Sequence, residues 1–184
     1  PSKVDERNYL VGLLKGAVRR CPIVSKKKKR VDMKTLFASS LVLMSLISSQ
    51  VWSLTLDDLV ERDGLNYEKF TDFPFTGEVA EGPEEGLFKN GKKEGLWIGC
   101  HSNGRLSYNG AWLEGSRHGA WIGYFDNGNL NFKGMVKRDR QDGLWEWYYE
   151  DGQLKSRGEF INGKRDGRWV WFHSNGNNWA SGRY

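Results

Sequence analysis

Residues 151–169 read DGQLKSRGEFINGKRDGRW, and this stretch contains three markers that return along the chain every 24 residues. The markers are an Asp-Gly or Asn-Gly pair, a lone glycine, and a Gly-x-Trp triplet. A constant period without insertions indicates one structural unit that is copied and stacked. The triplets end at Trp97, Trp121, Trp145 and Trp169, and the lone glycines are Gly86, Gly110, Gly134, Gly158 and Gly182.

Side chains alternate in polarity within each unit. From Leu106 to Trp112 every second residue is apolar or glycine, which is typical of an antiparallel strand with one buried face. An Asn-Gly pair such as Asn103-Gly104 should supply the positive φ angles of a tight hairpin. A second turn, at Asn90-Gly91 and its copies, returns the chain. We expect the copy at Asp139 to differ in shape, because the other copies have glycine there.

This pattern predicts an all-β fold: a single-layer meander, or solenoid, of stacked antiparallel β-hairpins, with four repeats over 86–184. A capping segment, 54–85, precedes them. Thr55 and Asp58 resemble a capping box and predict a brief helix over 55–62 that shields the first hairpin. The repeat tryptophans should form a continuous apolar spine, since each ring can bury about 150–250 Å². The lone glycines should make room for those rings rather than contact a ligand.

Charge is divided unevenly along the 184 residues. Residues 1–53 contain 11 Lys/Arg and 3 Asp/Glu, whereas residues 54–184 contain 17 and 20. The net charge of +5 therefore comes from the amino-terminal segment. With a balance of −3, the repeat region does not predict a nucleic-acid surface.

An apolar run, Leu36–Ile47, follows Met33 and is typical of a secretory signal peptide over 33–53, which should be helical. The run is shorter than the roughly 20 residues that cross a hydrocarbon core, and a permanent anchor is the alternative interpretation. Residues 1–32 are interpreted as an upstream basic segment outside the mature protein. Alternatively, Lys26–Arg30 extends the signal peptide or forms a basic patch. The predicted location is the periplasm or the extracellular space.

The chain has few residues with the chemistry of a catalytic or metal site. Cys21 precedes the predicted mature start, so Cys100 is expected to be an unpaired thiol, and no disulfide or zinc site is predicted. No phosphate loop, nucleophile elbow or zinc-protease motif is present. We therefore expect no catalytic residue, no metal and no cofactor.

Two pairs of residues share columns of the repeat. His101 and His173 should lie about 29 Å apart, too far to bind one ion. Asp142 and Asp166 should lie about 9–10 Å apart, near the carboxylate spacing of inverting glycosidases. Because the repeat itself generates this pair in predicted exposed turns, we interpret both as solvated acids.

The sequence resembles MORN-type repeats, specifically the bacterial variant that is often labelled antitoxin-type. The resemblance rests on NGKKEGLW at 90–97, on residues 151–169, and on FPFTG at 73–77, and it covers about 59–184. It implies a non-catalytic stack of hairpins that contacts a protein or, in some relatives, a lipid headgroup. An antitoxin role would then be exercised outside the cytoplasm, as by an immunity protein.

Basic residues gather in the turns that precede the tryptophan strands. Stacking should align them as a ridge along one edge, which could meet an acidic partner or phospholipid headgroups; the alternative is an ordinary charged turn that deters edge pairing. We predict an exported, non-enzymatic protein-binding module, possible self-association at the carboxyl-terminal strand edge, and peripheral membrane binding as the alternative function. The candidate binding residues are Lys92, Lys93, Arg117, Arg138, Arg140, Lys164 and Arg165.

Overall fold

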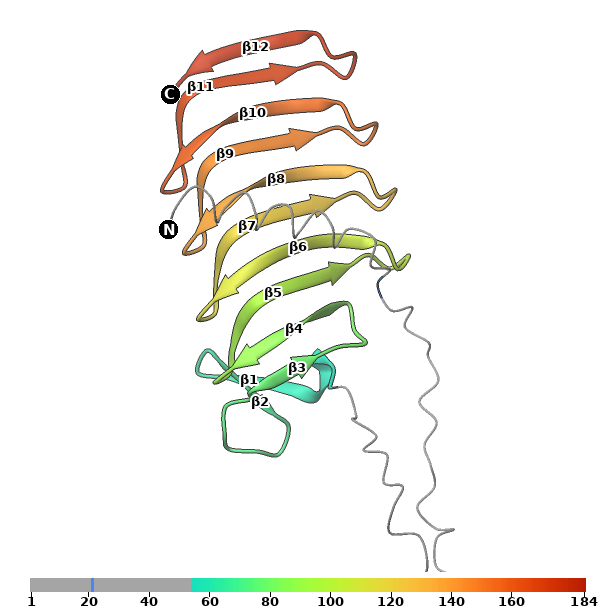
Figure 1. Cartoon of the computed structure of the whole chain (residues 1–184), viewed down its shortest axis with the longest axis vertical. Helices are drawn as coiled ribbons and strands as arrows, with labels where there is room; N and C mark the ends of the chain where they lie inside the picture. Colours follow the sequence, from blue (N-terminus) through green and yellow to red (C-terminus); the bar gives the residue numbers. More distant parts are fainter. Residues whose placement is uncertain (1–20, 22–53) are drawn as a thin grey trace, which may run out of the picture.

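The structure, a computed structural model, describes Cys21 and residues 54–184. Figure 1 shows the strands lying one above another in chain order, from β3 at the bottom to β12 at the top. The predicted signal peptide, 33–53, lies outside the described residues, as does the upstream segment, 1–32, apart from Cys21.

One ten-stranded antiparallel sheet contains the repeats, and a two-stranded hairpin, β1 (Leu59–Arg62) and β2 (Leu65–Glu68), precedes it. The strand order of the large sheet follows the sequence, so the predicted all-β meander of stacked hairpins is confirmed. Its strands are β3 (Gly77–Val79), β4 (Glu84–Lys89), β5 (Lys92–Cys100), β6 (Leu106–Leu113), β7 (Ser116–Tyr124), β8 (Leu130–Lys137), β9 (Arg140–Tyr148), β10 (Leu154–Ile161), β11 (Lys164–Phe172) and β12 (Asn178–Arg183).

Two-residue turns join the strands at one end of the sheet, which we call the turn end. Both central residues of these turns have positive φ, the type I′ geometry that matches the twist of paired strands. The third turn, expected to differ, keeps this geometry: φ is 49° at Arg138 and 63° at Asp139, against 50° and 75° at Asn90 and Gly91. As at Gly115 and Gly163, the backbone N–H of Asp139 donates to a carbonyl oxygen of the preceding repeat, that of Arg117, at 3.0 Å. The Asp139 carboxylate adds two bonds, because Oδ1 accepts from the N–H and Nε of Arg117 at 3.0 and 3.1 Å.

Longer loops join the strands at the other end, the loop end. The sequence predicts that the Asn-Gly pairs at this end form tight hairpin turns with positive φ at both residues. This prediction is wrong, because only the glycine of each pair has positive φ, for example 77° at Gly104. The asparagine instead holds the loop: Asn103 Oδ1 accepts from the Arg105 N–H at 3.0 Å, and Nδ2 donates to the Asp126 carbonyl of the next loop at 2.7 Å. Side-chain amides therefore connect successive loops.

The repeat tryptophans lie in a row on one side of the sheet, which we call the aromatic face. They are buried, with 0% of Trp97 and 1% of Trp169 exposed. Each indole covers the lone glycine of the preceding strand; a Cβ added at Gly110 would lie 2.3 Å from the Trp121 ring. Each indole Nε1 also donates to the carbonyl ten residues earlier, at 2.8–3.2 Å. Every ring is thus fixed by the preceding strand.

Glycine is needed for different reasons at different positions. Gly95, the first residue of a Gly-x-Trp triplet, has φ 70° and open space around its Cα, so its backbone conformation requires glycine. The ladder shifts register opposite this point, between Glu85 and Leu87, as at a β-bulge. At Gly182 the nearest atom to an added Cβ is 3.9 Å away, in Trp171, so crowding does not require glycine there.

The capping segment packs against the first tryptophan. Leu59, Phe75, Val79 and Phe88 form a buried cluster with Trp97. This cluster covers the amino-terminal end of the tryptophan row with apolar side chains, in place of a further repeat.

The predicted helix over 55–62 is wrong beyond Asp58. A capping box is present: the Thr55 N–H donates to Asp58 Oδ2 at 3.0 Å, and the Thr55 hydroxyl donates to the same oxygen at 2.8 Å. The helix is nevertheless a single 3₁₀ turn, Leu56–Asp58. Strand β1 begins at Leu59, which is buried in the cluster around Trp97. Tertiary packing therefore overrides the local helix signal. Among the residues described, no helix is long and apolar enough to cross a membrane.

The expectation of an unpaired Cys100 is also wrong in this structure. Cys100, at the end of β5, forms a disulfide with Cys21, which is buried with 5% exposed. Their Cα atoms are 6.0 Å apart, a separation that a disulfide spans. The interpretation failed because it excluded Cys21 from the mature chain, so no partner remained for Cys100.

Candidate functional site

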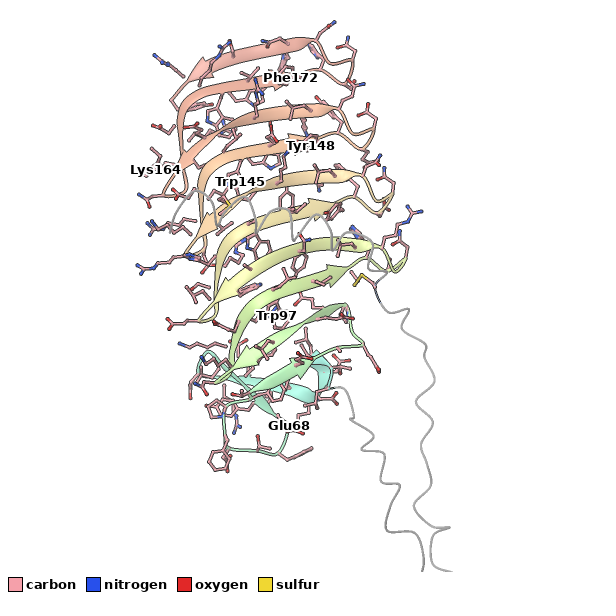
Figure 2. All side chains as sticks on the ribbon, in the orientation of Figure 1. Glu68, Trp97, Trp145, Tyr148, Lys164 and Phe172 are labelled. Carbon is pink, nitrogen blue, oxygen red and sulfur yellow. A yellow bond between two sulfur atoms is a disulfide. The ribbon has the colours of Figure 1, made fainter. Side chains whose placement is uncertain are left out.

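The candidate basic residues divide between the two faces of the sheet, because neighbouring residues on a strand point in opposite directions. Lys93, Arg117 and Arg165 share the aromatic face with their cross-strand partners Phe88, Trp112 and Phe160. Lys92 and Lys164 begin strands β5 and β11, one residue earlier, and point to the opposite face. Arg140 begins β9 and lines a hollow at the turn end of the aromatic face. Figure 2 shows Lys164 at the turn end, and Trp97 and Trp145 between the two ends. The predicted single ridge is therefore two rows.

The basic residues of the aromatic face contact the tryptophan rings. Lys93 Nζ lies 3.9 Å from the ring centre of Trp97, and Arg165 Cζ lies 4.5 Å from that of Trp169. Arg117 is 5.7 Å from Trp121. Cations over indole faces stabilise by about 0.5–2 kcal/mol. These three candidates stabilise the aromatic row.

Lys93 belongs to a hydrogen-bonded cluster in the first repeat. Its Nζ lies 2.6 Å from Glu84 Oε2, and the Tyr108 hydroxyl donates to Glu84 Oε1 at 2.8 Å. Burial raises the pKa of Glu84, but the hydrogen bonds from Lys93 and Tyr108 outweigh it and hold that pKa below its ordinary value. Burial and the bond to Glu84 raise the pKa of Tyr108 well above its ordinary value.

A similar cluster lies on the opposite face in the second half of the sheet. Lys133 Nζ is 2.8 Å from Glu146 Oε2, which also accepts from the Tyr148 hydroxyl at 2.9 Å. Burial raises the pKa of Glu146, and the bonds from Lys133 and Tyr148 bring it below its ordinary value.

Arg117 also forms hydrogen bonds to Asp139 in the third turn. Its Nε and backbone N–H donate to Asp139 Oδ1 at 3.1 and 3.0 Å. Burial raises the pKa of Asp139, but the bonds from Arg117 outweigh it and lower that pKa.

Exposed basic and apolar side chains occur together on the opposite face and its turns. The basic candidates exposed there are Lys92, Arg138 and Lys164, and the exposed apolar residues are Leu87, Leu96, Leu113, Leu144 and Ile161.

The third repeat differs from the others at the turn end of the aromatic face. Elsewhere an aromatic ring pairs with a cation, but here Val136 pairs with Gln141. Among the residues described, no cation lies over the ring of Trp145, which belongs to the same repeat. Sequence reasoning missed this site. The signal was nevertheless present, since Gln141 is the one residue in its column that is neither lysine nor arginine.

Two open hollows lie beside Gln141. The first, of about 510 Å³, is lined by Val136 and Trp145 among others, and the second, of about 450 Å³, by Phe160 and Trp169. Both hollows include Gln141 and Trp147 in their walls, so they are neighbours around one side chain.

A change in the order of side-chain sizes occurs at the same place. Large and small residues alternate along one row of directly paired positions on the aromatic face. The alternation breaks once, where Phe132 pairs with Trp147 and two large rings become neighbours. We call this point the size boundary. The row reads Gly99, Tyr108, Gly123, Phe132, Trp147, Ser156, Trp171 and Ala180.

The remaining polar candidates are used locally. His101 Nε2 lies 2.9 Å from the Tyr124 carbonyl oxygen. Asp142 and Asp166 lie within β9 and β11, not in the exposed turns predicted for them, and both are half-buried. Asp142 Oδ1 accepts from the Asn162 N–H of the next turn at 3.4 Å. Residues 54–184 contain no group of three His, Cys, Asp or Glu side chains placed to hold a metal ion.

Comparison with known proteins finds a family model that matches two stretches of the repeat region. The family model described as MORN repeat variant matches residues 117–138 and 141–162. The search of curated proteins found no match. A solved structure, the crystal structure of the GtfA/B complex bound to UDP and GlcNAc, aligns with a TM-score of 0.22 at 10% identity, over 97% of this chain and 37% of that one.

Proposed function

We propose that this chain, which carries repeats of the MORN variant type, binds another protein through the aromatic face of its sheet. MORN repeats are generally protein- or membrane-binding modules. The observation that carries the proposal is the pair of neighbouring hollows in that face, whose walls combine aromatic rings with basic side chains and Gln141, because ligands bind in concave sites. Stacked repeats present such sites on one continuous surface.

Binding rather than catalysis is the role that these side chains support. A catalytic site needs a nucleophile or a general base within hydrogen-bond reach of the reacting group. His101 is held at the Tyr124 carbonyl and Asp142 at the next turn. An antitoxin- or immunity-like activity is the finer form of the proposal, and the partner would then be a protein toxin.

Site-specific photo-crosslinking tests the binding face. A photoreactive residue replaces Gln141 on the aromatic face or, as the matched control, Glu159, which is exposed on the opposite face beside Leu144. In a native extract, we expect a crosslinked protein from position 141 and none from position 159. Crosslinks from position 159 alone, or from neither position, would exclude the proposal.

A second function is favoured by the opposite face. Exposed lysines and arginines beside exposed leucines suit binding to the surface of an anionic membrane. Changing Lys92, Arg138 and Lys164 together to glutamate should abolish salt-sensitive sedimentation with anionic liposomes. Lys93 and Arg165 are left unchanged, because both hold tryptophan rings and their loss would weaken the fold. Equal sedimentation of the variant excludes this function.

We also propose export, on the signal-peptide pattern over 33–53. Disulfides persist mainly in oxidising compartments, which supports the proposal. However, the Cys21–Cys100 disulfide requires Cys21 in the same chain as the repeats, whereas cleavage after Ser53 would remove it. Intact-mass measurement of the native protein without reductant decides between the two. A mass that begins at Leu54 supports cleavage, and a mass that includes Cys21 excludes it.

A further inference from the structure

We propose that the third repeat binds an extended acidic peptide across its strands, and that Gln141 and Val136 create the specificity by leaving space. This inference rests on the proposed protein-binding function and names the chemistry of the partner. In the other three repeats the positions equivalent to Val136 and Gln141 are occupied by an aromatic ring and a cation. In the next repeat these are Phe160 and Arg165, which fill the corresponding space.

The two hollows have the size and spacing for two side chains of one peptide. Volumes of about 510 and 450 Å³ fall in the range of ligand sites. The walls of the first hollow come mainly from β7, β8 and β9, and those of the second mainly from β9, β10 and β11. The hollows therefore flank Gln141 and Trp147 on β9, and the two strands beside β9 are about 10 Å apart. A peptide in the extended polyproline II conformation has three residues per turn and rises about 3.1 Å per residue, so side chains three residues apart lie on one side, about 9 Å apart, and would reach both hollows.

Charge selects an acidic partner. The walls of the two hollows contain four basic residues and one acidic residue, Asp139, which is already paired with Arg117. Arg140 in the first hollow has no ion-pair partner within 54–184, and Lys155 in the second lies only over the Tyr149 ring, at 5.5 Å. Carboxylates of a bound peptide would pair with these two cations.

A cationic occupant fits less well. Gln141 leaves the indole of Trp145 without a cation, which could admit a lysine or arginine of a partner. Four basic residues in the walls would repel that group, and like charges across an interface cost several kcal/mol. A peptide with apolar side chains flanked by glutamate or aspartate fits better. Its apolar side chains would pack against the aromatic rings, and its carboxylates would pair with the basic residues of the walls.

The test uses labelled hexapeptides and fluorescence anisotropy with the full chain. The acidic series has leucine or phenylalanine at positions 2 and 5 and glutamate elsewhere; the basic series has lysine in place of glutamate. We expect the acidic series to bind more tightly than about 1 mM and the basic series not to bind. Equal binding of both series, or no binding by the acidic one, overturns the inference.

The decisive variant is Val136→Phe with Gln141→Arg, which restores the side chains of the fourth repeat and fills the hollows. The added guanidinium would attract an acidic peptide, so an affinity loss of about tenfold or more can come only from lost space. Its urea midpoint should match or exceed that of the wild type, because the guanidinium can cover Trp145. Gln153→Arg, in the exposed loop of the same repeat, adds the same charge outside the hollows and should bind as the wild type does.

Arg140→Gln and Lys155→Gln test the charge pairing without altering the ring walls. Each should weaken binding of the acidic series about threefold or more and reduce its salt dependence. If a partner crosslinks from position 141 but binds the filled variant unchanged, the inference fails and the proposed function stands. If nothing crosslinks and no peptide binds, both fail.

Discussion

The two halves of the sheet build one aromatic face from opposite choices of side chain. In the first two repeats a glycine on the tryptophan strand pairs with a ring on the next strand, as Gly123 does with Phe132. In the last two repeats the tryptophan strand supplies the ring, and Trp147 pairs with Ser156. In both halves each pair joins one large and one small side chain, so the combined size of a pair stays similar. This is expected because a packed layer must be filled without overlap. The two hollows lie where the two arrangements meet.

The largest expected effect tests whether the halves are equally stable. Trp97→Ala and Trp169→Ala remove rings that are 0% and 1% exposed, and each should lower the free energy of unfolding by about 3–5 kcal/mol. Urea denaturation followed by circular dichroism measures both. A difference between the two losses larger than about 2 kcal/mol would contradict the equivalence of the halves.

A second experiment moves the size boundary by one repeat. Gly123→Trp alone should cost about 3 kcal/mol, because even a Cβ at this position would lie 2.2 Å from the Phe132 ring. Adding Phe132→Ser reproduces the third repeat and should recover at least about 1 kcal/mol of that loss. Recovery is partial, since Tyr108 still pairs with position 123. Strictly additive costs in the double-mutant cycle would contradict the pairing rule.

The carboxylate clusters of the two halves should respond alike to acid. The pKa of Glu84 and that of Glu146 are lowered in the folded state, so each contributes stability above its ordinary pKa and loses it as pH falls through the lowered value. Glu84→Gln or Glu146→Gln should therefore flatten the decline in stability below about pH 4.5, with a cost of about 1 kcal/mol at pH 7. Urea midpoints at pH 3 and pH 7 measure this, and an unchanged pH dependence in both variants contradicts it.

The smallest expected effect concerns the loop end. Asn127 Nδ2 donates to the Glu150 carbonyl of the next loop at 3.0 Å, but Asp151, one repeat later, has no amide to donate to the Ser174 carbonyl. Asp151→Asn should raise the free energy of unfolding by about 0.5 kcal/mol. Asn127→Asp, the reverse exchange one repeat earlier, should lower it by a similar amount. A stabilising Asn127→Asp would contradict the role given to these amides.

The sequence was sufficient for the architecture because the period is carried by residues with strong local consequences. The lone glycines and the tryptophans together specify strands that pack ring on backbone, and the strand order follows from short connections. The division of the basic residues between faces was also within reach, since Lys92 and Lys93 are adjacent on one strand.

Other features depend on contacts that no local pattern encodes. Asp139 keeps the type I′ turn through bonds to Arg117, which lies in the preceding repeat. Cys21 and Cys100 are separated by 79 residues, and their pairing requires the chain to return to β5. The hollows require two unremarkable residues, Val136 and Gln141, to be compared with their columns rather than considered alone.

The size boundary has the character of a stacking fault in a layered crystal. Substitutions can move such a fault along the stack. It persists as long as the repeats on one side place the ring on the tryptophan strand and those on the other side place it on the next strand. Duplication of the second repeat alone would lengthen the stack on one side and leave one fault. Copying both repeats that flank it, as a block, would create a second contact between two large rings, and with it a second pair of hollows, and the two ring contacts would be separated by a fault at which two small residues meet. The number of such hollows would then depend on which repeats are copied, not on how many.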